Sequence, residues 1–206
     1  MKAGKVSIQL ITRVGVLAAM AIALSFLESN LIIPMLPFFP NFLKLDIGDL
    51  PALLAAFAFG PLAGVLVEVL KNAVHLFGSQ TSGVGELANM IIGSSFVATA
   101  GLIYRLRRNR LAAYLGMALG TLVMTAVACA SNYYVLLPLY GRLGFSVEAI
   151  IGLANLAGNT LVKDMPTLLL YVFVPFNLIK GLLVSILTGL VYKRVSPLLH
   201  GVRTHT

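Results

Sequence analysis

The apolar stretch from Pro166 to Lys193 reads PTLLLYVFVPFNLIKGLLVSILTGLVYK, which is long enough to cross a bilayer. A spanning helix needs about 20 largely apolar residues, and a lysine inside one costs about 2.5 to 3.5 kcal/mol on insertion scales. Asn177 and Lys180, near the middle of this stretch, are three residues apart and share one face of a helix. We expect this face to line a cavity. The alternatives are snorkelling to an interface or an ion pair with a buried carboxylate such as Glu28, Glu68 or Glu86.

The composition is that of an integral membrane protein. Of 206 residues, 59% are hydrophobic and 11% are charged, where an ordinary soluble domain carries about 25% charged residues. We therefore expect an all-α integral membrane protein, with residues 1–206 forming a single membrane-embedded domain. The formal net charge of +8 would favour nucleic acid binding in a soluble protein. Here the basic residues follow the pattern of a membrane protein, so no nucleic acid partner is expected.

Basic residues are concentrated at three places along the chain. Lys and Arg accumulate in cytoplasmic segments, so both termini and the loop at 105–110 are predicted to be cytoplasmic. An even number of spans follows. The residues at these three places are Lys2, Lys5 and Arg13; Arg105, Arg107, Arg108 and Arg110; and Lys193, Arg194 and Arg203.

Six transmembrane helices satisfy this orientation. Gly60-Pro61 is interpreted as a turn between two short spans, because one continuous span would place the 105–110 loop outside. Glu68 and Lys71 then share a helix face and form a plausible structural ion pair. A further partial helix is expected around 147–158. The six spans are placed at about 7–33, 48–60, 61–77, 86–104, 111–137 and 166–192.

The long first extracellular loop contains PMLPFFPNFLKL, from Pro34 to Leu45, whose three prolines exclude a continuous helix. Its apolar content favours a cap that folds over the protein. Polar side chains collect in the outer half or the middle of the membrane, which is typical of a pocket that opens outward and not of a continuous pore. These residues are Lys44, Asp46, Glu86, Asn89, Asn132, Asn177 and Lys180.

Motifs for enzymatic or metal chemistry are missing from the sequence. It contains no GxxxxGK[ST] phosphate loop, no GxSxG nucleophile motif, no clustered histidines and one cysteine, Cys129. We therefore expect no ATP site, no metal, no cofactor and no enzymatic activity. The alternative from a different class is a small membrane enzyme acting on a lipid or quinone, with Glu68, Glu86 or Asp164 as the catalytic carboxylate.

Small residues recur every four positions in the first span, at Gly15, Ala19 and Ala23. Such a stripe allows another helix to approach closely, because packing drives helix association in lipid. It serves either internal packing or the docking of another membrane subunit.

Four ordered blocks carry a resemblance to a known family. The chain resembles the riboflavin-specific substrate-binding subunit of energy-coupling factor (ECF) transporters over about residues 7–195. The resemblance implies a six-helix protein of the cell membrane, surrounded by lipid, that captures a vitamin from outside. It also implies a transmembrane coupling subunit and two cytoplasmic ATPases as partners, with Ala19-xxx-Ala23 contacting the coupling subunit. The blocks are KLDIGDLPALLAAFAFGPLAG (44–64), EVLKNAVHLF with GVGELANMIIG (68–77, 83–93), NYYVLLPLYG (132–141) and PFNLIKG (175–181).

The same resemblance implies where a flavin binds. Asn177 and Lys180 would recognise the pyrimidine edge of the ring, which has one N–H between two carbonyls. Asn132 and the segment 42–46 would contact the ribityl hydroxyls or close over them; within that segment the expected contacts are Leu43, Lys44, Leu45 and Asp46. Glu86 and Asn89 are assigned to the same pocket. Tyr133, Tyr134 or Phe176 could pack on the ring, and FMN or another vitamin is the alternative ligand.

Overall fold

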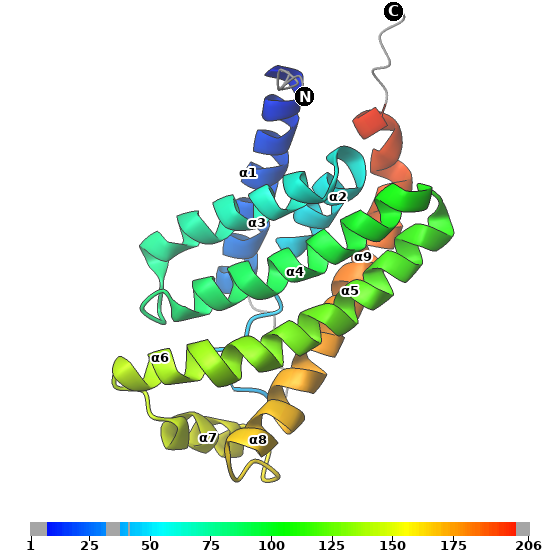
Figure 1. The fold of residues 1–206 in the computed structure, drawn as a ribbon. Coiled ribbons are helices and arrows are strands. Elements are labelled where there is room, and N and C mark those ends of the chain that lie inside the picture. The colour runs from blue at the N-terminus through cyan, green and yellow to red at the C-terminus, as the bar shows by residue number, and fades with distance from the viewer. Residues whose placement is uncertain (1–7, 32–37, 41, 201–206) are drawn as a thin grey trace, which may run out of the picture.

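The computed structural model describes residues 8–31, 38–40 and 42–200, with side chains described for 8–28, 38–40 and 42–192. Every regular element within these ranges is helical (Figure 1), which confirms the predicted all-α fold. The long helices are α1 (Ile8–Leu31), α3 (Pro61–His75), α4 (Val84–Arg107), α5 (Arg110–Ser131) and α9 (Val174–His200). The shorter ones are α2 (Asp49–Phe59), η1 (Leu76–Gly78), η2 (Asn132–Leu136), α6 (Leu137–Arg142), α7 (Val147–Leu156), α8 (Met165–Leu168) and η3 (Leu169–Phe173).

Five of the described helical stretches are long and apolar enough to cross a membrane. They are Ile8–Glu28, Pro61–Gly78, Val84–Arg107, Arg110–Arg142 and Met165–Tyr192. The predicted second span exists as α2, but its 11 residues reach only about 16 Å at 1.5 Å per residue, against a hydrocarbon core of about 30 Å. The described chain therefore has five helices long and apolar enough to cross a membrane and two shorter apolar helices, α2 and α7.

Helix α2 lies at the centre of the bundle, against α1, α3, α4 and α9. Residues 51–57 are all buried, so the helix has no lipid-facing side along this stretch. Its neighbours approach closely because small residues meet at the contacts. A Cβ added at Gly64 on α3 would lie 2.6 Å from the Cβ of Ala56, and one at Gly101 on α4 would lie 3.0 Å from it.

The break between α2 and α3 agrees with the predicted turn at Gly60-Pro61. Gly60 has φ of 101°, in a region that side chains disfavour, and Pro61 occupies the first turn of α3, where its missing N–H costs nothing. The two helices are therefore separate and antiparallel neighbours (Figure 1).

Two wide π-helical turns interrupt the expected fifth and sixth spans. The helix expected to end near residue 137 continues through η2 and α6 to Arg142, and η3 precedes α9. A proline follows each turn, Pro138 after η2 and Pro175 after η3. Pro175 has no N–H to offer the carbonyl four residues earlier, and that oxygen, of Tyr171, instead accepts a hydrogen bond of 3.1 Å from Asn159 Nδ2. Such turns are frequent at functional sites.

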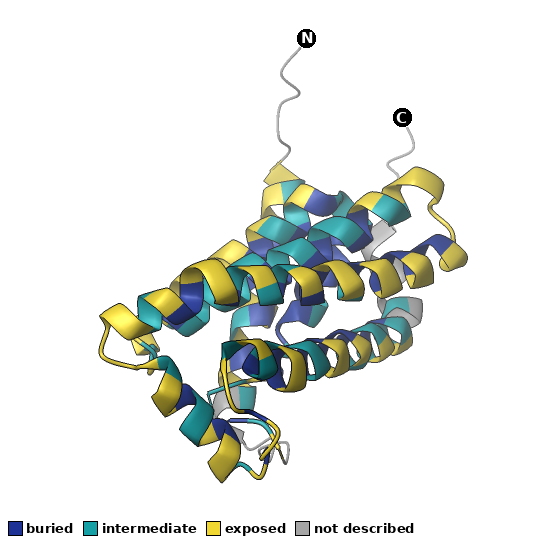
Figure 2. Cartoon of the chain, turned by 60° about the horizontal axis from the view of Figure 1, so that its bottom comes forward, coloured by how far each residue is buried: buried dark blue, intermediate teal, exposed yellow. Residues whose placement is uncertain are grey.

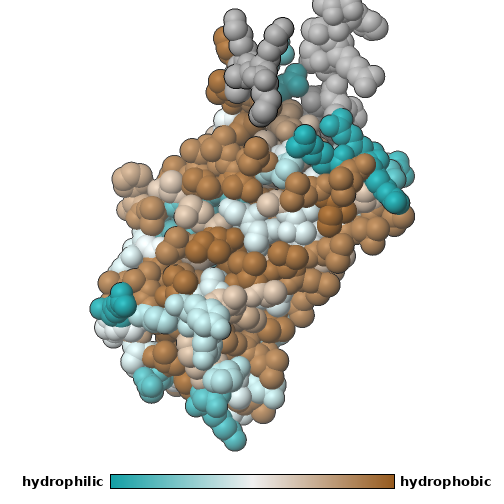
Figure 3. Space-filling view, viewed as in Figure 1, coloured by the Kyte–Doolittle hydropathy of each residue, from teal (hydrophilic) through white to brown (hydrophobic). Residues whose placement is uncertain are grey.

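The two ends of the bundle differ in what they carry. The beginning of α1, the turn between α4 and α5 and the end of α9 lie at one end, whereas the α3–α4 loop and α6 to α8 lie at the other (Figure 1). Buried residues face the helix contacts and exposed ones face outward (Figure 2). Hydrophobic side chains cover much of the flank in Figure 3, and hydrophilic ones gather toward the ends. This surface suits lipid contact around the flank.

Candidate ligand-binding cavity

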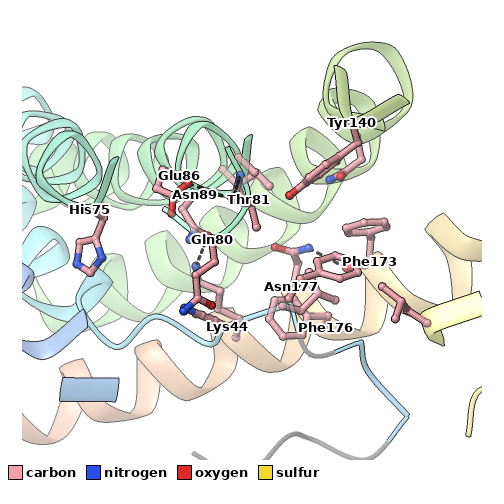
Figure 4. A pocket seen from close by; sticks show the side chains of 18 of the residues that line it. Lys44, His75, Gln80, Thr81, Glu86, Asn89, Tyr140, Phe173, Phe176 and Asn177 are labelled. Atoms are coloured by element: carbon pink, nitrogen blue, oxygen red, sulfur yellow. Dashed lines mark hydrogen bonds between the residues drawn. The ribbon is translucent and has the colours of Figure 1, made fainter. Parts of the chain in front are cut away.

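A cavity of about 450 Å³ lies between α4, η2, α9, the α3–α4 loop and the segment before α2. This volume is within the range of about 300 to 1,000 Å³ that small-molecule sites occupy. Figure 4 shows Glu86 and Asn89 on α4 across the space from Phe173, Phe176 and Asn177. The polar residues that line the cavity are Lys44, His75, Gln80, Thr81, Glu86, Asn89, Asn132, Tyr140, Asn177 and Lys180. Apolar lining residues include Phe26, Phe42, Leu43, Ile92, Leu153, Phe173 and Phe176.

Asn177 and Lys180 both line this cavity, as their spacing on one helix face predicts. Both are buried, with 3% and 1% of their surfaces exposed. Asn177 Nδ2 donates a hydrogen bond of 2.8 Å to the carbonyl of Phe173, inside the π turn, and Asn132 Nδ2 donates similarly to Ala128 at 2.8 Å. Each amide is thereby oriented, and each retains a second N–H and its oxygen for a ligand.

Lys180 forms an ion pair, but with a partner that the sequence did not suggest. Its Nζ lies 3.0 Å from Asp49 Oδ2 and 3.5 Å from Asn89 Oδ1. The carboxylates named as candidates were Glu28, Glu68 and Glu86, and this part of the interpretation was wrong because Asp49 begins α2 directly beside α9. Lys180 therefore combines the two roles considered, lining the cavity and pairing with a buried carboxylate.

A buried cluster of charges around Lys71 lies behind the cavity. Lys71 Nζ contacts Asp46 Oδ2 at 2.7 Å, Glu68 Oε2 at 2.9 Å and Asp49 Oδ1. The predicted pair between Glu68 and Lys71 is confirmed, and it is part of a larger network. An unpaired buried charge is strongly destabilising, and here three carboxylates surround the ammonium group of Lys71.

Asp46 belongs to this cluster and lies in the connection between α1 and α2. Its Oδ1 accepts a 2.5 Å hydrogen bond from Ser25, and its φ of 54° is in the left-handed region. Burial alone would raise the pKa of Asp46, but the charges of Lys71 and Lys180 lower that pKa well below its usual range.

Glu28 holds the segment that contains Asp46. Its two carboxylate oxygens accept hydrogen bonds from the backbone N–H groups of Asp46 (2.8 Å) and Ile47 (2.7 Å).

The expected contact segment 42–46 is therefore divided in two. Leu43 and Lys44 line the cavity. Leu45 is buried with 6% of its surface exposed, and Asp46 points to the charge cluster and borders a smaller polar space of about 50 Å³. These two residues support the wall of the cavity instead of lining it.

Glu86 and Asn89 lie together at the cavity, as expected from their spacing on one helix. Glu86 also organises the α3–α4 loop, because its Oε2 accepts hydrogen bonds from Ser79 Oγ at 2.6 Å and Thr81 Oγ1 at 3.1 Å. In consequence the loop contributes Gln80 and Thr81 to the lining.

Comparison with known proteins now identifies the family. The family model of the ECF transporter substrate-specific component matches residues 9–192. The chain belongs to this family of S components. It is 39% identical over 183 residues to the riboflavin transporter RibU of Staphylococcus aureus (strain TCH60), covering 89% of this chain and 88% of that protein. It is 28% identical over 188 residues to the riboflavin transporter FmnP of Bacillus subtilis (strain 168), covering 88% and 91%.

A solved structure supports the same assignment. It is described as the S component of a bacterial ECF transporter, has a TM-score of 0.71 at 35% identity, and covers 93% of this chain and 98% of that one. At this identity and coverage the S-component fold extends over nearly the whole chain.

Several cavity residues of this S component were missed by sequence reasoning. Phe26 and His75 stack with ring centroids 4.2 Å apart at the cavity, and Tyr140 and Phe173 also line it. Phe176 was anticipated as an aromatic contact. The other two candidates, Tyr133 and Tyr134, are 44% and 75% exposed and are not lining residues. Both tyrosines lie in the wide turn η2, which the apolar pattern of the span does not reveal; Pro138 after the turn is the local signal that could have indicated it.

The small-residue stripe of this S component faces outward. Gly15, Ala19 and Ala23 on α1 are exposed, and a Cβ added at Gly15 would meet no atom within 4 Å. In the described part of the chain, this stripe is therefore not used for packing against another helix. The described residues also contain no group of three or more His, Cys, Asp or Glu side chains placed to hold a metal ion.

Proposed function

We propose that this chain captures riboflavin from outside the cell at the cavity described above and delivers it as the S component of an ECF-type transporter. The observation that carries the proposal is the distribution of lining groups. Amides and a buried ammonium group lie on α4 and α9, and phenylalanines lie beside them. A flavin ring has the same division, with a hydrogen-bonding pyrimidine edge opposite a dimethylbenzene edge. Two relatives described as riboflavin transporters, at 39% and 28% identity, support this choice of ligand.

Within the proposed site, Asn177 and Lys180 recognise the pyrimidine edge, with Asn89 beside them. The amide supplies both donor and acceptor, and the ammonium group donates to a carbonyl. A site built from buried hydrogen-bonding groups discriminates strongly against analogues that leave those groups unpaired. Phe173 and Phe176 are placed to pack on the ring.

The ribityl chain is assigned to the other polar lining residues. Asn132 and Lys44 provide hydrogen-bonding groups, with Leu43 beside them. Glu86 holds the α3–α4 loop at the edge of the cavity by accepting hydrogen bonds from Ser79 and Thr81. Leu45 and Asp46 contribute by holding the wall from behind.

The proposed orientation has both termini in the cytoplasm, six membrane-crossing helices including the short α2, and a cavity open to the outside. It is supported by the position of the α4–α5 turn, which carries Arg105, Arg107, Arg108 and Arg110, at the same end as the beginning of α1 and the end of α9 (Figure 1). The first extracellular loop acts as a cap over the ligand. Residues 34–37 and 41 of this loop lie outside the described residues.

The proposed partners are one transmembrane coupling subunit and two cytoplasmic ATPases. Energy for transport would come from these proteins, because this chain contains no phosphate loop and acts as one membrane-embedded binding domain without catalysis of its own. The exposed face formed by Gly15, Ala19 and Ala23 suits close approach of a helix of the coupling subunit.

Uptake of labelled riboflavin tests this proposal. Cells that lack their own riboflavin transporter would express the chain with and without a coupling subunit and ATPases. We expect uptake only with the partners, with competition from excess unlabelled riboflavin and not from unrelated vitamins. Preferential competition by FMN would instead support the phosphorylated flavin as ligand. Conversion of a lipid or quinone by the chain alone would support the enzyme alternative.

A further inference from the structure

Lys180 has hydrogen-bonding capacity that the protein leaves unused. Its Nζ lies 3.0 Å from Asp49 Oδ2 and 3.5 Å from Asn89 Oδ1. The contact with Asp49 is an ion pair without a directed hydrogen bond, since Oδ2 has no hydrogen-bond partner among the described residues. An ammonium group carries three N–H donors. Lys180 is therefore held by charge, while donors remain for a group in the cavity.

Asp49 is the link between this lysine and the charge cluster. It is the first residue of α2, it is 1% exposed, and its two oxygens face Lys71 and Lys180. Lys71 keeps two other carboxylates, those of Asp46 at 2.7 Å and Glu68 at 2.9 Å. Lys180 has no other carboxylate within 4 Å in the described part of the chain. Loss of the Asp49 charge would therefore leave Lys180 without a partner and leave Lys71 paired.

We propose that Asp49 is a positioning residue of the binding site, which neutralises Lys180 and fixes its ammonium group so that a donor faces the ligand. This inference rests on the proposed function, because it assigns Asp49 to the flavin site without direct ligand contact. It explains how a buried lysine can serve recognition without the cost of an isolated charge.

The same arrangement specifies the kind of group that Lys180 accepts. The cluster holds three carboxylates, of Asp46, Asp49 and Glu68, against the ammonium groups of Lys71 and Lys180. Asp49 already balances the charge of Lys180, so an anionic group placed against Lys180 would put a second negative charge beside a buried carboxylate. A neutral carbonyl adds none. The part of the ligand at Lys180 is therefore a neutral acceptor, such as the carbonyl edge of a heterocycle.

A double-mutant cycle in riboflavin affinity tests the positioning role. Quenching of flavin fluorescence would give the Kd of the detergent-purified unaltered protein, Asp49→Asn, Lys180→Met and the double variant. Asp49→Asn keeps the shape and removes the charge, and we expect it to raise the Kd about tenfold to a hundredfold, the usual effect of disturbing a charged hydrogen-bonding group. In the Lys180→Met background the same change should have little further effect, because the group that Asp49 positions is already gone.

Glu68→Gln is the matched control, because it also removes a buried carboxylate bound to Lys71 but does not touch Lys180. We expect it to leave the Kd within about threefold, even if it lowers thermal stability. If Asp49→Asn alone fails to fold, Asp49→Glu takes its place in the cycle, because it keeps the negative charge and moves the carboxylate; it should weaken binding when Lys180 is present and have little effect in the Lys180→Met background.

Three outcomes would overturn the inference: equal weakening by Asp49→Asn with and without Lys180, equal weakening by Glu68→Gln, or unchanged affinity in Asp49→Asn. Absence of riboflavin binding by the unaltered protein would instead refute the proposed function. The two failures are therefore distinguishable in one set of titrations.

Discussion

The backbone of Gly93 on α4 lies directly against the carboxylate of Glu68 on α3, such that a Cβ at Gly93 would be 2.7 Å from Glu68 Oε2. That oxygen is the one that contacts Lys71, at 2.9 Å. A side chain at position 93 would therefore displace a buried charge and not a flexible apolar group. The absence of a side chain at Gly93 permits the carboxylate of Glu68 to lie against α4.

Gly93→Ala should lower the free energy of unfolding by about 1 to 3 kcal/mol, the usual cost of overpacking a core. Thermal unfolding of the detergent-solubilised protein would measure this. Gly152→Ala on α7 is the control, because a Cβ there would meet no atom within 4 Å. Equal stability of both variants would show that Glu68 moves aside without cost.

Glu28→Gln should loosen the segment that precedes α2. The carboxylate accepts hydrogen bonds from two consecutive backbone N–H groups, at Asp46 and Ile47. A glutamine has one acceptor oxygen and turns its NH₂ group toward the other backbone N–H. We therefore expect the free energy of unfolding to fall by about 1 to 3 kcal/mol. Hydrogen exchange at residues 42–47 should accelerate. Glu148→Gln, at an exposed carboxylate, is the control. Unchanged exchange in Glu28→Gln would mean that other contacts hold this segment.

Asn177→Ala and Lys180→Ala should each weaken flavin binding by about 1 to 3 kcal/mol, because each leaves a polar edge of the ligand without its partner. The fold should persist, because Asp49 keeps its ion pair with Lys71 when Lys180 is replaced. Titration of each purified variant with riboflavin provides the measurement. Asn155→Ala, at an exposed asparagine on α7, should bind normally. Unchanged affinity in both cavity variants would contradict the assignment of the pocket.

Ala19→Leu and Ala23→Leu should abolish riboflavin uptake and preserve riboflavin binding. Both positions are exposed on α1, so a larger side chain does not disturb the cavity but prevents close approach of a partner helix. Uptake in cells and binding in detergent, measured on the same variants, separate the two effects. Ala126→Leu, at an exposed alanine on α5, should keep both activities. Normal uptake by the α1 variants would exclude this face as the docking surface.

Local patterns predict much of this fold. Apolar length predicts the long helices, Gly60-Pro61 predicts the break between α2 and α3, and the three-residue spacing of Glu68 and Lys71 predicts their ion pair, which forms at 2.9 Å. Each of these depends on residues near one another in the sequence. The shared cavity face of Asn177 and Lys180 is predictable for the same reason.

Contacts between distant segments were less predictable. Asp49 and Lys180 meet only because α2 packs beside α9, and no spacing in the sequence encodes that placement. Leu45 and Asp46 turn away from the cavity within a non-helical segment, where no periodicity indicates which side chains face inward. The π turn η2 directs Tyr133 and Tyr134 outward. These differences concern the orientation of single side chains, whereas most of the polar residues singled out from the sequence do line one cavity: Lys44, Glu86, Asn89, Asn132, Asn177 and Lys180.

Riboflavin binding in the cavity is the property on which both the proposed function and the role of Asp49 depend. The most direct measurement is the visible absorption spectrum of the protein purified in detergent from cells grown with riboflavin, followed by identification of the small molecule released on denaturation. We expect a yellow protein that releases riboflavin in a one-to-one ratio. A colourless protein that also fails to quench the fluorescence of added riboflavin would contradict the claim.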